Sequence, residues 1–173
     1  MIIDNPKSHF ILVIHPRILN GGKYTIYQGS EMNNGEVMQY WGKWLVLGEP
    51  DYLKILADKF DPLVESEKIP CIKYDRQPSA NLGIKECVMM VYCDRRKRDH
   101  IWKILEKHGI KLKAWVTEKE TMEMWLPGGK LMEQWLAGTD FDEETKNKNR
   151  EDALMRINHI LEHPDAIFFP WAQ

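Results

Sequence analysis

The sequence lacks most of the signals that assign a protein to a class. No apolar run approaches the ~20 residues that a membrane-spanning helix requires, and the start, Met1 to Pro6, has neither the basic nor the apolar region of a secretory signal. The glycine-rich phosphate loop, the dinucleotide-binding Gly-x-Gly-x-x-Gly and the serine-hydrolase Gly-x-Ser-x-Gly are also absent. Nucleotide hydrolysis, dinucleotide redox chemistry, serine hydrolysis and membrane association are therefore disfavoured.

Cysteine is scarce as well. Cys71, Cys87 and Cys93 are an odd number, and none belongs to a closely spaced pair of the kind that zinc or redox-dithiol sites use. We therefore expect free thiols, buried in strands and kept reduced in the cytoplasm. His159 and His163 stand four residues apart, but no third ligand accompanies them. Neither a metal nor a cofactor is expected.

The composition is that of an ordinary globular domain. Of the 173 residues 43% are hydrophobic and 29% are charged, and no repeat or linker divides the chain, so one domain spanning residues 1–173 is expected. The formal net charge of -2 means that an anion or a nucleic acid would need a local cationic patch. The chain contains seven tryptophans, which is an unusually high number. Tryptophan rings either pack in the core or stack on a flat ligand.

Short apolar runs alternate with helical periodicity. The run 87–93, bounded by polar residues, predicts a central strand in which residues 88, 90 and 92 face opposite to residues 89 and 91. Further strands are expected near residues 9–15, 44–47, 71–74 and 111–116, and helices near residues 51–65, 99–108, 130–136 and 142–163. Strands joined partly by helices and partly by turns favour an α+β fold, a mixed sheet with helices packed on one face and the other face free for a ligand.

The tail of the chain is strongly apolar. Ile167, Phe168, Phe169 and Trp171 place four large side chains within five positions. Soluble monomers avoid such an exposed patch, so we expect the tail to return to the sheet as a last strand or to pack on a second copy in a homodimer.

Two cations and one tryptophan are the first candidates for a site. Lys73 lies within the predicted strand 71–74 and Arg76 just beyond it. A strand lysine can meet an anion as a point charge, and an arginine can bind it through two parallel hydrogen bonds. Trp41, in the turn expected before the strand 44–47, either stacks on a ligand or belongs to the core. Together they favour a binding module for an anionic ligand such as a nucleotide or a phosphopeptide.

His15 and Arg17, at the end of the first strand, suggest an alternative. Histidine exchanges protons near neutral pH, so a lyase or transferase acting on a phosphorylated substrate could use Lys73 as base, His15 as acid, and Arg17 or Arg76 to hold the phosphate. A further alternative is a protein-interaction adaptor that uses the charged helix 142–163. The cationic run 95–98, at an expected helix start, is either another phosphate site or a solvated loop.

Several of these segments together resemble a known family. Residues 42–46, 69–74, 88–92 and 113–116, with the helix end at 108–110, are similar to the family of the basophilic leukaemia expressed protein, described as a phosphothreonine lyase domain. Its fold is similar to that of the messenger-RNA cap-binding translation initiation factor, whose Gly-Arg-Trp-Leu strand resembles Gly42-Lys43-Trp44-Leu45. The resemblance covers about residues 40–130 and implies a curved, mostly antiparallel sheet backed by helices. In cap-binding proteins a glutamate directly follows one tryptophan. No tryptophan of this chain is followed by glutamate, so the resemblance implies the fold and not cap recognition.

Overall fold

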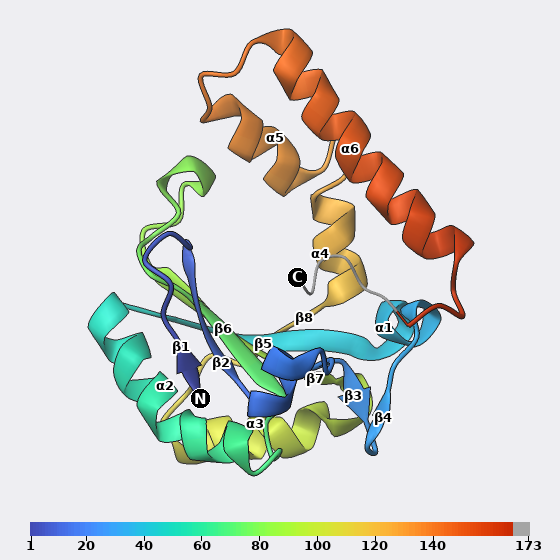
Figure 1. The fold of residues 1–173 in the computed structure, drawn as a ribbon. Coiled ribbons are helices and arrows are strands. Elements are labelled where there is room, and N and C mark those ends of the chain that lie inside the picture. Colours follow the sequence, from blue (N-terminus) through green and yellow to red (C-terminus); the bar gives the residue numbers. More distant parts are fainter. Residues whose placement is uncertain (168–173) are drawn as a thin grey trace.

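The computed structural model of the chain describes residues 1–167 and centres on a six-stranded sheet (Figure 1). The strands lie in the order β1-β2-β6-β7-β5-β8, and every neighbouring pair is antiparallel. Their bounds are β1 (Ile2–Ile3), β2 (Phe10–Ile14), β5 (Trp41–Gly48), β6 (Cys71–Asp75), β7 (Cys87–Asp94) and β8 (Ala114–Thr117). The α+β fold with mostly antiparallel pairing is confirmed. A long helix connects β5 to β6, and these two strands run in the same direction. They are not neighbours, because β7 lies between them and is antiparallel to both, so the sheet of the described residues contains no parallel pair.

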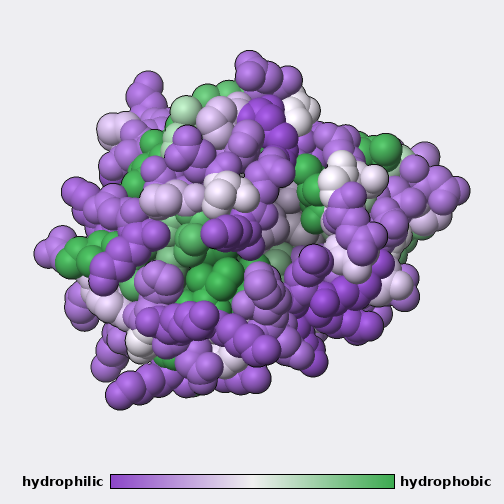
Figure 2. All heavy atoms as spheres, turned by 90° about the horizontal axis from the view of Figure 1, so that it is seen from below, coloured by the Kyte–Doolittle hydropathy of each residue, from purple (hydrophilic) through white to green (hydrophobic). Residues whose placement is uncertain are grey.

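One face of this sheet is covered by α2 (Pro50–Glu65) and α3 (Arg98–Lys107), as expected. In α2 the buried residues Leu53, Leu56 and Phe60 recur at spacings of three and four, which places them on one side of the helix. They belong to the main core of the molecule together with strand residues of β2, β5, β6 and β7. The outer side of the two helices, seen from below in Figure 2, is mostly hydrophilic with a small hydrophobic area near its centre.

The strand β7 confirms the predicted central strand. It lies between β6 and β5, and Met89 and Val91 are buried in the core that contains α2 and α3. Met90 and Tyr92 belong instead to a second cluster on the opposite face. This alternation follows from the two-residue period of extended backbone.

The opposite face is covered in part, which corrects the expectation of a wholly free face. The elements on it are η1 (Pro16–Asn20), α1 (Asn34–Tyr40), α4 (Glu118–Met124) and α6 (Glu143–Glu162). Val37, Met122 and Ile157 from three of these helices pack in one cluster with Trp41. Trp41 is the first residue of β5 and pairs with Asp94, so it lies in the sheet and not in the turn expected before it.

A separate hairpin of β3 (Ile26–Tyr27) and β4 (Ser30–Glu31) flanks the sheet, and Arg96 fastens it. The Arg96 guanidinium lies 3.5 Å from the ring centroid of Tyr27 and 3.8 Å from that of Tyr40. It also donates two hydrogen bonds, of 2.9 and 2.7 Å, to the buried carboxylate of Asp94. This cation of the run 95–98 is therefore part of a structural cluster.

The last two helices also pack against each other beside the sheet (Figure 1). α5 (Lys130–Ala137) and α6 enclose a minor core of Met132, Leu136 and Ala153, which confirms the helices predicted at 130–136 and 142–163. The chain after α6 returns to α1, where the backbone N–H of Asn34 donates to the Ala166 carbonyl.

Two expectations are not tested by these residues. The tail beyond Ile167 lies outside the described part of the chain, and the one-domain organisation stays a prediction. No helix within residues 1–167 is long and apolar enough to cross a membrane.

Candidate functional site

A cavity of about 240 Å³ opens on the partly covered face of the sheet, over β2 and β6. The antiparallel register sets Leu12 opposite Lys73 and Ile14 opposite Cys71, so that side chains two residues apart on each strand line the same surface. The lining residues, drawn from three strands, η1 and two loops, are Ser8, Phe10, Leu12, Ile14, Ile18, Tyr24, Cys71, Ile72, Lys73 and Tyr92. The lining is predominantly apolar and aromatic and contains a single cation.

Lys73 is the cation of this lining, and its ammonium group is poorly compensated. Its Nζ lies 3.8 Å from the ring centroid of Phe10 and makes no hydrogen bond or ion pair with any residue of the range 1–167. Burial lowers the pKa of Lys73, and repulsion by the ammonium of Lys43 lowers it further. A half-buried charge without a partner is the arrangement that a bound anion would stabilise.

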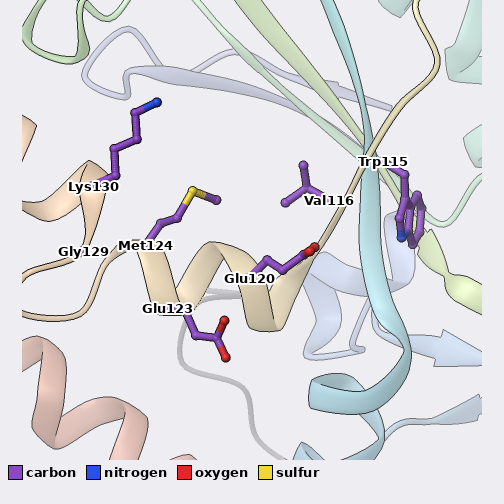
Figure 3. Close-up of a pocket in the computed structure, with 7 residues that line it drawn as sticks. All are labelled: Trp115, Val116, Glu120, Glu123, Met124, Gly129 and Lys130. Carbon is purple, nitrogen blue, oxygen red and sulfur yellow. The ribbon is translucent and has the colours of Figure 1, made fainter.

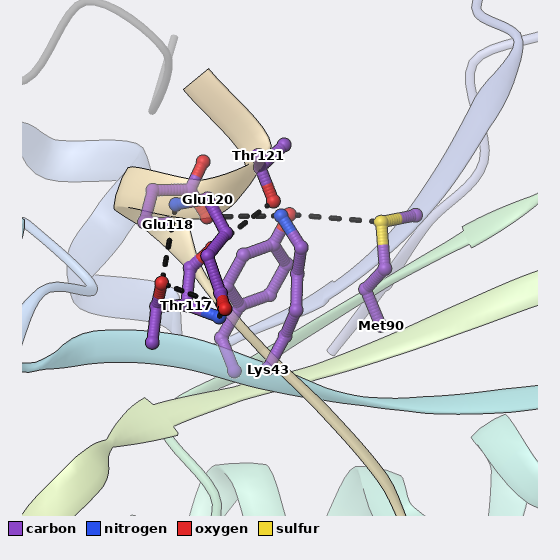
Figure 4. Close-up of polar contacts among 7 residues, drawn as sticks. Lys43, Met90, Thr117, Glu118, Glu120 and Thr121 are labelled. Carbon is purple, nitrogen blue, oxygen red and sulfur yellow. Dashed lines mark hydrogen bonds and ion pairs between the residues drawn. The ribbon is translucent and has the colours of Figure 1, made fainter. Parts of the chain in front are cut away.

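Lys43 and Glu118 form a buried ion pair next to the cavity (Figure 4). The Lys43 Nζ donates to Glu118 Oε2 at 3.0 Å, and the two residues are only 5% and 6% exposed. Glu118 is placed by the start of α4, where the Thr117 side chain accepts a hydrogen bond from the amide of Glu120 and the Glu120 carboxylate accepts one from the amide of Thr117. The charge of Lys43 is thus already neutralised.

Aromatic side chains close one end of the cavity. The rings of Tyr92 and Trp41 are stacked with centroids 6.4 Å apart, and Tyr24 lies 6.0 Å from Tyr92. Burial raises the pKa of both tyrosines, so their hydroxyls stay protonated at neutral pH. The Tyr92 hydroxyl donates to the Met90 sulfur at 3.7 Å. Burial also raises the pKa of the Cys71 thiol, which therefore does not supply a thiolate nucleophile.

The sequence-predicted residues are not brought together in this cavity. Lys73 faces it, but Trp41 is only 1% exposed and presents no free ring face to a ligand. The Arg76 guanidinium pairs with Asp4 and donates to the backbone carbonyl groups of Asn5 and Ser8, which fastens the segment before β2 to the end of β6.

His15 and Arg17 lie at the other end of the β2–β6 pair. The His15 ring accepts a hydrogen bond from the Arg17 amide and caps η1, and the Arg17 guanidinium pairs with Glu67. Arg76 is hydrogen-bonded through its backbone to His9, six residues before His15, so Arg76 and His15 are roughly 20 Å apart along the strand. One small substrate cannot contact both.

Other residues of the site were not predicted from the sequence. Lys43 had a usable signal, since the strand period places it on the same face as Trp41 and opposite to Trp44. The helix start at Glu118 was marked by the pattern Thr117-x-x-Glu120. The contact between Lys43 and Glu118 joins positions 75 residues apart, and no local pattern specifies it.

A second hollow, of about 480 Å³, lies between β8, α4 and the start of α5 (Figure 3). Val116 and Met124 point towards each other across it, whereas Glu123 points away. Two glutamates and one lysine line it, a charge balance that opposes an anion, and it includes none of the residues singled out from the sequence. The smaller cavity is therefore the candidate site.

No family model matches this chain, and no curated protein or solved structure matches it significantly. The resemblance of residues 40–130 to the basophilic leukaemia expressed protein family stays a prediction.

Proposed function

We propose that this chain is a binding module for a small anionic ligand, held in the cavity over β2 and β6. The observation that supports the proposal is the Lys73 ammonium group, which lines the cavity without a hydrogen-bonding or ion-pair partner in the described part of the chain. An anion there would replace the solvation that the ammonium loses by burial, and would favour its charged form. Phosphorylated groups, as in a nucleotide or a phosphopeptide, and carboxylates all belong to this ligand class.

The surroundings of Lys73 favour an anion over a cation or a neutral molecule. The nearby ammonium of Lys43 adds positive potential, although its pairing with Glu118 offsets most of it. The protonated hydroxyl of Tyr24 is a further donor at the aromatic end, whereas the Tyr92 hydroxyl donates to the sulfur of Met90. Neither the enzymatic nor the adaptor alternative gains support from a specific contact among residues 1–167.

The test is a binding screen by protein-observed NMR with matched sets of small anionic, neutral and cationic compounds, repeated with Lys73→Met. We expect anionic compounds alone to shift resonances around Lys73. The substitution should weaken their binding about 10- to 150-fold, the equivalent of the roughly 1.5–3 kcal/mol that a hydrogen bond to a charged group contributes. Methionine keeps the length of the lysine stem, so the shape of the cavity is retained.

Lys111→Met is the matched control, because Lys111 is exposed in the loop before β8 and the change of charge is the same. It should leave binding unchanged. The proposal fails if neutral compounds bind at the cavity as often as anionic ones, or if Lys73→Met binds the anions as tightly as the unchanged protein.

Two further proposals concern the setting of the protein. The three cysteines are free and buried, which agrees with our proposal of a reducing compartment, the cytoplasm, as its location. Cell fractionation tests it. The homodimer suggested by the apolar tail is tested by light scattering across a range of concentrations.

A further inference from the structure

We infer that the ligand is a small monocarboxylate with an apolar body, and not a nucleotide or another phosphorylated molecule. This inference rests on the proposed function and narrows it. Three properties of the cavity support it: its volume, its charge and the side chains along its length.

The volume limits how much of a ligand the cavity can enclose. An apolar cavity of about 150 Å³ holds one benzene molecule, so the cavity of about 240 Å³ has room for roughly ten non-hydrogen atoms. A nucleoside monophosphate has more than twice that number, and a drug-sized ligand usually occupies about 300–1,000 Å³. A ring or branched chain with one small polar group is the size that fits.

The charge limits the ligand to a single negative unit. Lys73 is the one cation among the lining residues, and no arginine fork or second unpaired cation of the described chain joins it there. A phosphate monoester carries about −1.5 to −2 at pH 7. The excess charge would lie near the carboxylates of Glu118 and Asp75, which act on the charge of Lys73 and so lie within electrostatic range of it. A carboxylate carries one negative charge, which balances the charge of the Lys73 ammonium group and leaves no excess charge to be repelled by Glu118 and Asp75.

The carboxylate of Asp75 is not available to pair with Lys73 in place of a ligand. It accepts a hydrogen bond from the Val88 amide at 2.9 Å and lies 3.3 Å from the Nε2 of His9. Its position two residues from Lys73 on β6 adds negative potential at the cavity end, which disfavours a dianion most.

The order of side chains along β2 gives the ligand a direction. Lys73 stands opposite Leu12 and holds its ammonium group over the Phe10 ring, so the charged end of the cavity is at the start of β2. From there the lining continues through Ile14 to Ile18 and the aromatic end, without another charge. A carboxylate at Lys73 therefore leaves the apolar body of the ligand against apolar side chains, whose burial contributes to affinity.

Three of the probes that test this inference share a phenyl ring and differ in the polar group: 3-phenylpropanoate, its neutral amide and phenyl phosphate. The fourth probe, adenosine monophosphate, is a larger phosphorylated molecule. Calorimetric titration gives the affinities, and NMR shift changes locate each probe. We expect 3-phenylpropanoate to bind in the cavity about tenfold more tightly than either the amide or phenyl phosphate. Adenosine monophosphate should not bind there.

Two variants separate charge from shape. Lys73→Met should weaken 3-phenylpropanoate at least about tenfold without affecting the amide. Leu12→Phe adds a ring to the cavity without a change of charge and should weaken both. If Leu12→Phe does not fold, as judged by circular dichroism, Ile18→Phe in η1 fills the cavity from its edge. Lys111→Met should leave every affinity unchanged.

The outcomes distinguish the inference from the proposed function. If phenyl phosphate or adenosine monophosphate binds at Lys73 more tightly than the carboxylate, the inference fails while the anion-binding function stands. If the amide binds as tightly as the carboxylate and Lys73→Met has no effect, both fail. Binding of the carboxylate outside the cavity also overturns the inference.

Discussion

Removal of one partner of the buried Lys43–Glu118 pair should destabilise the protein strongly. Lys43→Met leaves the Glu118 carboxylate only 6% exposed and without its 3.0 Å partner. Removing one member of a buried pair costs about 3–5 kcal/mol, and the place of Glu118 in the first turn of α4 returns up to about 1 kcal/mol through the helix dipole. We therefore expect a loss in the lower part of the roughly 3–5 kcal/mol range, about 3–4 kcal/mol, which is a large share of a typical stability of about 5–15 kcal/mol.

The assay is urea unfolding followed by tryptophan fluorescence and circular dichroism. With a urea dependence of about 2 kcal/mol per molar, the midpoint should fall by roughly 1.5–2 M. Thermal unfolding gives a second readout, a decrease of about 6–16 °C for a chain of this size. The exposed Lys111→Met should stay within about 0.5 kcal/mol of the unchanged protein.

The double variant Lys43→Met with Glu118→Leu decides whether the pair itself is the cause. Without either charge no unpaired ion remains, so stability should return to within about 1 kcal/mol of the starting protein or rise above it. Lys43→Met should also raise the pKa of Lys73, because it removes a repulsive ammonium group and leaves the attractive carboxylate of Glu118 unpaired. The reasoning is refuted if Lys43→Met costs less than about 1 kcal/mol, or if the double variant is as unstable as the two single losses added together.

Three further predictions follow from other parts of the fold. Arg96→Lys keeps the charge but loses the two hydrogen bonds to Asp94 and the contact with two tyrosine rings. Urea unfolding should therefore show a decrease of about 1–3 kcal/mol in the free energy of unfolding, and a decrease of less than about 0.5 kcal/mol would contradict this role. Hydrogen bonds from Arg150 and a backbone amide lower the pKa of Glu133 from 4.5 to about 2, so this carboxylate stabilises the fold above its ordinary pKa and loses that effect as the pH falls towards 2. Glu133→Gln should flatten the pH dependence of the melting temperature in that window, and an unchanged slope would count against the pair. Deletion of residues 166–173 should lower the melting temperature by several degrees, whereas an unchanged melting curve with full solubility would assign the tail to a partner.

The sequence predicted those parts of the fold that depend on local periodicity. The strand at 87–93 and the helix containing Leu53, Leu56 and Phe60 were both marked by the spacing of their apolar residues. The strand expected at 111–116 was shifted, since the pairing with β5 begins at Ala114. The order of strands was not predicted, because it depends on which distant segments pair.

The candidate site was only partly predictable for the same reason. Lys73 was a candidate because a lysine within a predicted strand can meet an anion on the open face of the sheet. Whether Arg76 and His15 face a ligand or a neighbouring segment depends on Asp4 and Glu67, which lie far from them along the chain. The two-residue period of a strand alone could not distinguish a cation without an ion-pair partner from one that is already paired with a carboxylate.

The contact between β5 and α4 also has a consequence for synthesis on the ribosome. Lys43 emerges 75 residues before Glu118, and at about 5–20 residues per second its partner follows roughly 4–15 s later. The apolar residues of α6 that pack near Trp41 emerge later still. In the nascent chain the face with α2 and α3 can therefore close while the opposite face remains hydrated. The residues that line the ligand cavity all lie within positions 8–92 and so emerge before Glu118. Lys43, beside that cavity, keeps its water until the carboxylate of Glu118 is available to replace it.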